Sequence, residues 1–287
     1  MIAPPRSTQH GVALILVLMV TAVLGLLILQ ISLTAKEHTS RAQRLLDRAE
    51  VDLKVRSANA ELLFSLATNE WGRGGNPESS DPIARIWRFD AQAFPVEGVE
   101  IRMQDLSGLL PAPQPGGSVA GFDRALRAVG VLDEQIYPAM NRLADSQAPP
   151  GFVPLQHFQE LAILGGLDRQ QIRRLDEVST LYPARYFNPS TATDAALAAR
   201  FSGSVLAGLR ALREQNRLDA ISYFSLTGEG GDESISFLPG PGFRIRVLVT
   251  MGDVSAAEEL SVTVDPYASR PFLVWSRRRP EPPADPS

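Results

Sequence analysis

The 287-residue chain contains no cysteine and only three histidines, His10, His38 and His157. The lack of cysteine excludes disulfides, thiolate metal sites and a cysteine nucleophile. The three histidines lie far apart in the sequence and do not show the spacing of a zinc site. With 28 basic and 32 acidic residues, the chain also lacks the basic excess that is typical of nucleic-acid-binding proteins.

Enzyme motifs are missing as well. The sequence contains no nucleophile elbow, P-loop or zinc motif. The glycine pair at residues 165–166 could belong to a helix-hairpin-helix element that binds DNA, but the nearby Asp168, Asp176 and Glu177 oppose contact with phosphates. We therefore expect no catalysis and no nucleic-acid partner.

What the chain does have is a long apolar run near its N-terminus. Residues 12–29 carry no charge, which is long enough for a membrane helix. Gly11 immediately precedes the run, and Arg6 is the one charged residue before it. Because no acidic residue occurs before Glu37, the positive-inside rule places the N-terminus in the cytoplasm and the residues beyond about 35 outside.

Two simpler interpretations compete with a processed membrane anchor. A secretory signal has a shorter apolar core, of about 7–15 residues, followed by small residues at a cleavage site. The segment Leu33-Thr34-Ala35 matches that site poorly. The other alternative is an uncleaved signal anchor, which the apolar run also fits.

The helix is predicted to continue beyond the membrane. Residues 36–69 contain no proline or glycine, and apolar side chains recur there at steps of three or four residues. This spacing draws one apolar stripe, formed by Val51, Val55, Ala58, Leu62 and Leu66. We expect a sheet to cover the stripe.

The rest of the chain alternates between strand-like and helix-like segments. Apolar and polar residues alternate, or apolar residues cluster, as in β-strands at residues 99–103, 243–249, 260–264 and 272–275. Residues 118–217 follow a proline- and glycine-rich break at 111–117 and show only short helical patterns. Asp168 is a suitable N-cap for one of these helices, and Ser190 or Thr191 for another.

Together these patterns predict an α+β fold with a long N-terminal helix packed on an antiparallel sheet. We expect a leader at 1–11, a transmembrane helix at 12–35, a first scaffold part at 36–112 and a second at 218–276. An all-α domain at 118–217 would be inserted between the two parts, and residues 277–287 would form a disordered tail.

A leader that ends in glycine before an apolar helix resembles the precursors of type IV pilin-like proteins. Most of them carry glutamate five residues after the cut, where this chain has Leu16. The missing glutamate and the large insert resemble the K-type minor pseudopilins of type II secretion systems, also called general secretion pathway protein K. The resemblance implies cleavage by a prepilin peptidase between Gly11 and Val12.

Two further segments carry the resemblance. Asn188, Thr191 and Ala192 match the asparagine-x-asparagine-threonine-alanine segment of the family, although Ser190 replaces its second asparagine. Asp105 opens a stretch, residues 105–108, that is similar to the family's strand-ending motif.

The resemblance implies a non-enzymatic subunit that caps the pseudopilus tip and helps to initiate its assembly. Its partners would be other minor pseudopilins, the prepilin peptidase and the bacterial inner membrane, with the bulk of the chain in the periplasm. Family members are associated with calcium, and the densest acidic loop here contains Glu229, Asp232 and Glu233. A flexible acidic turn is the simpler explanation of this loop. The alternative function is a signal-anchored periplasmic hydrolase or a binding module.

Overall fold

A computed structural model of the chain describes residues 9–72, 74–112, 122–146, 158–160, 166–182, 184, 186–229 and 234–280. The helices are α1 (Gln9–Thr68), α2 (Pro82–Ile86), η1 (Leu106–Gly108), α3 (Phe122–Ala128), α4 (Asp133–Ser146), α6 (Arg169–Val178), α7 (Asp194–Arg200), α8 (Gly203–Glu214) and α9 (Ala220–Thr227). The strands are β1 (Asp90–Val96), β2 (Val99–Asp105), β3 (Leu110–Pro111), β4 (Ser179–Thr180), β5 (Gly242–Met251), β6 (Val254–Val264) and β7 (Phe272–Arg278).

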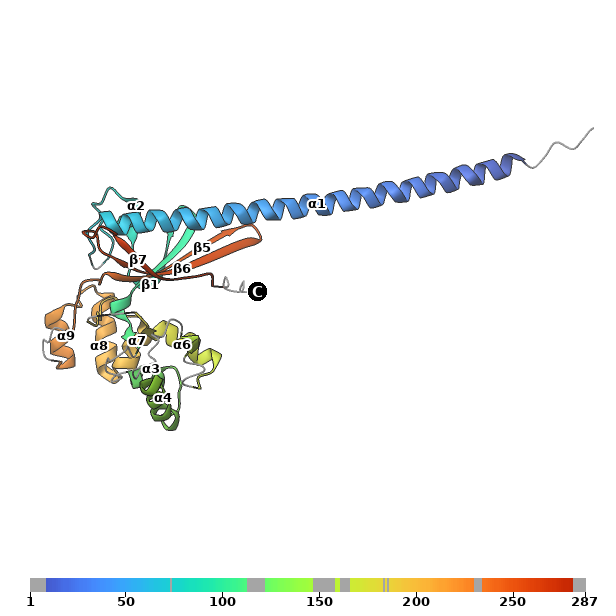
Figure 1. Cartoon of the computed structure of the whole chain (residues 1–287). Helices are drawn as coiled ribbons and strands as arrows, with labels where there is room; N and C mark the ends of the chain where they lie inside the picture. Colours follow the sequence, from blue (N-terminus) through green and yellow to red (C-terminus); the bar gives the residue numbers. More distant parts are fainter. Residues whose placement is uncertain are drawn as a thin grey trace, which may run out of the picture.

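Helix α1 has 60 residues and projects far beyond the rest of the molecule (Figure 1). Its apolar N-terminal part contacts no other element, and each described side chain from Leu14 to Leu46 is exposed. The predicted stripe on the C-terminal part is confirmed, because Val51, Val55, Leu62 and Leu66 are buried against the sheet. Periodicity in the sequence therefore identified the face of the helix that packs.

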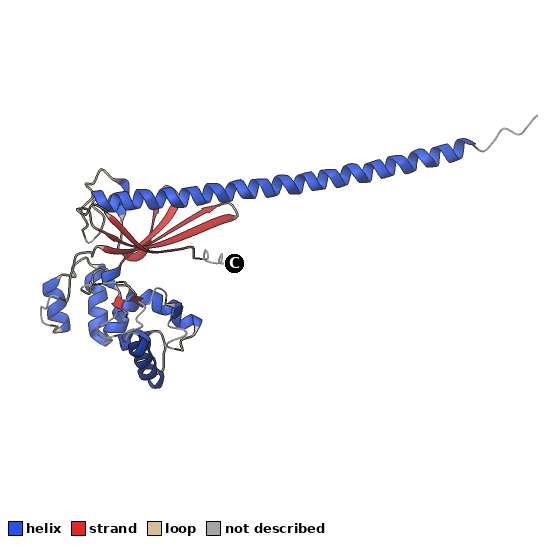
Figure 2. Ribbon diagram, viewed as in Figure 1, coloured by secondary structure: helices blue, strands red, loops and turns tan. Residues whose placement is uncertain are grey.

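A five-stranded antiparallel sheet covers this stripe, with strand order β1-β2-β5-β6-β7. Alternate residues of β2, β5 and β6 point toward α1 and build one hydrophobic core, in which Ile101, Phe243, Ile245 and Val262 are almost fully buried. The helix lies on one face of the sheet and a layer of short helices lies on the other (Figure 2). The predicted α+β fold, a long helix on an antiparallel sheet, is confirmed.

The prediction of a single early strand was incomplete, because β1 precedes β2 and forms the edge of the sheet. Its sequence contains Pro95, which an edge strand tolerates because one row of its backbone groups has no partner. The pairing of β1 with β2 is irregular between Asp90 and Ala93, and Ala91 has a φ of 63°. These departures from regular strand geometry hide the strand from a search for alternation.

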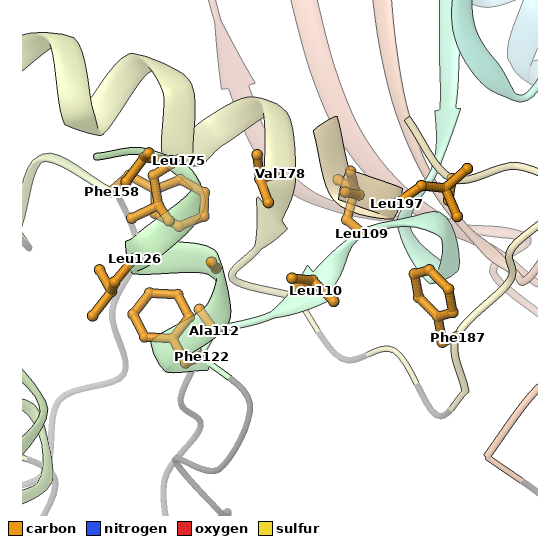
Figure 3. Close-up of a cluster of buried hydrophobic side chains, with 14 of the residues drawn as sticks. Leu109, Leu110, Ala112, Phe122, Leu126, Phe158, Leu175, Val178, Phe187 and Leu197 are labelled. Carbon is orange, nitrogen blue, oxygen red and sulfur yellow. The ribbon is translucent and has the colours of Figure 1, made fainter. Parts of the chain in front are cut away.

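The short helices α3, α4 and α6 to α9 pack around a second hydrophobic core, and we call this layer the head. Leu110, Phe122, Leu126, Leu175 and Leu197 contribute to that core (Figure 3). The prediction of an all-α insert was wrong in one respect. Two residues of β3 pair in parallel with two residues of β4 inside the head.

The head also extends beyond residue 217, where the sequence placed the return to the scaffold. Helix α9 follows that position, and its Tyr223 is fully buried in the core of the head. Phe237 packs against the same core, so the chain rejoins the sheet only at β5. At the other end of the sheet, β7 includes Arg277 and Arg278, which had been assigned to the disordered tail.

The predicted start of a helix in the head is correct where the capping side chain bonds a residue close to it in the sequence. Asp168 caps α6 as predicted and forms a capping box with Gln171. Ser190 and Thr191 do not cap α7, because its N-cap is Thr193, whose side chain accepts a hydrogen bond from the backbone of Ala196. Thr191 instead bonds a residue 86 positions away, and this long-range contact belongs to the junction described next.

Candidate functional site: the head junction and the membrane helix

The head is joined to the sheet through the carboxylate of Asp105, at the end of β2. This side chain is fully buried, and four groups donate hydrogen bonds to it. One oxygen accepts from the backbone N–H of Ser107 at 2.9 Å and of Gly240 at 3.2 Å. The other accepts from the hydroxyl of Thr191 at 2.8 Å and the amide of Asn188 at 3.1 Å. A single carboxylate thus holds three separate chain segments together.

The environment of Asp105 acts on its pKa in two directions. Burial raises the pKa of this carboxyl, and it is the largest contribution. The bonds donated by Thr191, Ser107 and Gly240 oppose that effect because they favour the charged form. The two backbone N–H groups and the Asn188 amide can only donate, so these three contacts favour the ionised form, although burial raises the pKa of the carboxyl overall.

The family-like segment, residues 188–192, is organised around this carboxylate. Asn188 donates to Asp105 and to the carbonyl of Leu238 at 2.9 Å, and its own carbonyl accepts from Ser190. Ser190, which stands at the position of the family's second asparagine, therefore fixes the orientation of the first. Ala192 is fully buried in the core of the head.

Two glycines allow the segments to approach this closely. A Cβ atom on Gly108 would lie 2.6 Å from the carbonyl oxygen of Thr191, and a Cβ on Gly240 would lie 2.3 Å from the hydroxyl of Ser107. The first of these contacts is with backbone, which cannot turn aside. Residues 105–108 and 188–192 thus form one packed junction.

A second junction is ionic and lies between α6 of the head and the sheet. Asp176 of α6 contacts Arg244 of β5 at 3.3 Å and Arg278 of β7 at 2.9 Å. Arg278 also contacts Glu259 of β6 at 2.5 Å. Although burial opposes it, the two carboxylates keep the pKa of Arg278 above its ordinary value. Two junctions at different places hold the head in one orientation on the sheet.

Sequence reasoning singled out Asp105, Asn188 and Thr191 but did not place them together. It did not select Gly240 or the ionic residues Asp176 and Arg244. Nothing in the local sequence marks these residues, because the bonds that they form across the junctions span 65 or more positions. The one available signal was the polar pair Gln104-Asp105 at the end of an alternating strand.

The calcium candidates are only partly described by the structure. Glu229 contacts Arg200 at 3.0 Å, and it also accepts a hydrogen bond from the hydroxyl of Tyr223. Asp232 and Glu233 lie outside the described residues. Within the described ranges, no three histidine, cysteine, aspartate or glutamate side chains are grouped to hold a metal ion. A calcium site in this loop stays a prediction.

Helix α1 carries the remaining predicted residues. Gly11 and Val12 lie in its first turns, and Leu16 is 62% exposed. From Leu14 onward the helix is long and apolar enough to cross a membrane, with a mean hydropathy of 2.9 over an 18-residue window that is not buried at all. These features fit a single-pass membrane anchor.

The arrangement of α1, sheet and head can be compared with solved structures. One similar chain belongs to the crystal structure of the GspK-GspI-GspJ complex from the enterotoxigenic Escherichia coli type 2 secretion system. The two chains share the fold. The match has a TM-score of 0.53 and covers 85% of this chain and all of the other, at 14% sequence identity.

The similarity lies in the structure and not in the sequence. No protein-family model and no curated protein matches this chain. At 14% identity most side chains differ, so the comparison supports the pilin-like fold, and roles of particular residues have to be argued from the contacts themselves.

Proposed function

We propose that this protein is a non-enzymatic minor pseudopilin of a type II secretion system, which caps the tip of the pseudopilus and helps to initiate its assembly. The observation that carries the proposal is a pilin-like scaffold whose sheet bears a rigidly attached head on the face opposite α1 (Figure 2). A head of this width opposes the stacking of another subunit above it. The anchor would be in the bacterial inner membrane and the head in the periplasm.

The position of Leu16 supports a place at the tip. A carboxylate near the centre of a bilayer costs about 2.5–3.5 kcal/mol on insertion scales, so a subunit retains one there only where it gains a partner. In pilin-like subunits this partner is the N-terminal amine of a neighbour already in the filament. The first subunit has no such neighbour above it, and a leucine at this position then costs nothing.

Helix α1 carries a second apolar stripe, which faces away from the sheet and is available to other minor pseudopilins. Leu46, Leu53 and Phe64 are 64–66% exposed. Each lies nine positions from a buried residue, which is about two and a half turns at ~3.6 residues per turn and therefore the opposite side of the helix. A similar helix from another minor pseudopilin would cover this stripe and bury its apolar side chains.

Site-specific photo-crosslinking in cells that express the secretion system tests this assignment. A photoreactive residue at Phe64 is expected to form an adduct with another minor pseudopilin, because its side chain faces away from the sheet. The same residue at Lys54, on a different side of α1, serves as the control and should give little product. If the Lys54 position crosslinks as strongly as the Phe64 position, the stripe is not the contact.

Cleavage between Gly11 and Val12 is the second expectation. Mass spectrometry of the mature protein should find Val12 at the N-terminus, with or without a methyl group. Gly11→Leu should leave the full-length precursor in the membrane, because a bulky side chain replaces the small residue before the cut, whereas Gly11→Ala should be partly processed. A mature chain that begins at Met1 or near Lys36 would contradict the proposal.

A further inference from the structure

A groove separates the head from the outer face of the sheet, which is the face that α1 does not cover. Strands β1, β2 and β5 line one wall, and α6 and α7 line the other. Its volume is about 1410 Å³, which exceeds the ~300–1,000 Å³ that is usual for sites of small molecules. The size therefore suits a segment of polypeptide.

The floor of the groove carries an unusual row of charge. In the register of the sheet, Arg102 of β2 lies directly opposite Arg246 of β5. On its other side, Arg246 lies opposite Glu259 of β6, and Glu259 in turn lies opposite Arg278 of β7. The row thus contains three guanidinium groups and one carboxylate. Like charges directly opposite each other on neighbouring strands destabilise a sheet, so folding alone does not favour this arrangement.

Ion pairs inside the molecule leave part of this charge uncompensated. Glu259 is occupied by Arg278, and Arg102 contacts Glu100 at 2.8 Å. Within the described part of the chain, no carboxylate lies within 4.0 Å of Arg246, nor of Arg173, which lines the opposite wall from α6. The lining as a whole carries seven arginines and five carboxylates, and one of these carboxylates, Glu177, also has no ion pair among the described residues. The excess of positive charge therefore lies with Arg246 and Arg173, and Arg102 is half engaged.

The lining also contains a buried acceptor. Gln104 is 4% exposed, and its amide N–H groups donate to the carbonyls of Asp105 and Thr191. These bonds fix the amide, and among the described residues its own carbonyl oxygen accepts no hydrogen bond. A buried polar atom without a partner costs about 1–3 kcal/mol. Because this oxygen is itself enclosed, it lies beneath the lining, and the charged side chains form the surface that a ligand meets.

We propose that this groove binds an extended, acidic segment of a partner protein. Neighbouring strands lie about 4.8 Å apart, so one carboxylate of the segment can reach both Arg102 and Arg246. A second carboxylate can reach Arg173 on the other wall.

The position of the groove selects a protein over a lipid surface. Arg279, at its edge, contacts Asp52 of α1 at 3.8 Å. Asp52 lies 16 residues beyond Lys36, the first charge after the apolar run, which is about 24 Å along the helix at ~1.5 Å per residue. Charges on a membrane surface are screened within about 8 Å at physiological ionic strength, so lipid head groups do not act at this distance.

Fluorescence anisotropy with the full-length protein in detergent micelles tests the proposal. The probe is a labelled ten-residue peptide of alternating glutamate and serine, and a lysine–serine peptide of the same length is its counterpart. The acidic peptide should bind, the basic one should not, and the affinity should fall as salt is raised. Arg102→Gln with Arg246→Gln should weaken binding at least tenfold.

The matched control is Arg217→Gln with Arg270→Gln, which removes the same charge from exposed positions away from the groove. This control should bind like the unmodified chain. The groove variant should unfold at the same temperature or a higher one, since a repulsive pair has been removed. Equal weakening in both variants, tighter binding of single-stranded DNA or of anionic vesicles, or no binding of the acidic peptide would overturn the proposal. The test does not depend on a role in secretion.

Discussion

Replacing Asp105 by asparagine is expected to lower the free energy of unfolding by about 4 kcal/mol. The amide NH₂ must occupy the place of one carboxylate oxygen, and there it would face at least one N–H group that can only donate. Hydrogen bonds to a charged group contribute about 1.5–3 kcal/mol, and each buried donor that is left unpaired costs about 1–3 kcal/mol. The expected loss is a large fraction of the ~5–15 kcal/mol that stabilises a typical domain.

Denaturation of the full chain in micelles, followed by tryptophan fluorescence, measures this loss. Asp253→Asn, the same change at an exposed turn between β5 and β6, is the control and should change stability by less than about 0.5 kcal/mol. The Asp105 variant should also be cleaved by protease within the head sooner than within the sheet. If the two variants prove equally stable, the carboxylate does not hold the junction.

Leu62→Ala on α1 should destabilise the scaffold by about 3 kcal/mol, because it removes a fully buried side chain and leaves a cavity between helix and sheet. Leu53→Ala changes the same residue type on the opposite side of the same helix, where the side chain is 64% exposed. It should leave stability within about 0.5 kcal/mol of the original.

The two leucine variants should separate stability from assembly. In cells, Leu53→Ala should reduce recovery of the protein with other minor pseudopilins while its abundance stays unchanged. Leu62→Ala should lower the abundance of the protein itself, because it destabilises the fold. Equal loss of abundance in both variants would show that the exposed stripe supports the fold of the subunit and has no role in contact between subunits.

The parts of the fold that the sequence predicted are those with a strong local period. The stripe from Val51 to Leu66 and the strands β5 and β6 repeat their apolar residues in a way that only one secondary structure satisfies, whereas β7 was predicted from a short apolar run. Asp168 was recognised as a cap because its partner, Gln171, is three residues away.

The parts that were missed depend on distant partners. Strand β1 contains Pro95 and an irregular register, and only pairing with β2 makes it a strand. Thr191 looks like a helix cap, but its hydroxyl instead binds Asp105, 86 positions earlier. The boundary of the head was set too early because α9 follows a loop-like stretch, and only the burial of Tyr223 assigns it to the head.

The place of the protein in a pseudopilus is the central claim, and gold labelling of an epitope in the exposed turn at Gly252-Asp253 tests it most directly. In cells that assemble extended pseudopili, the cap proposal predicts label at one end of each filament. Label spaced along the filament would contradict it.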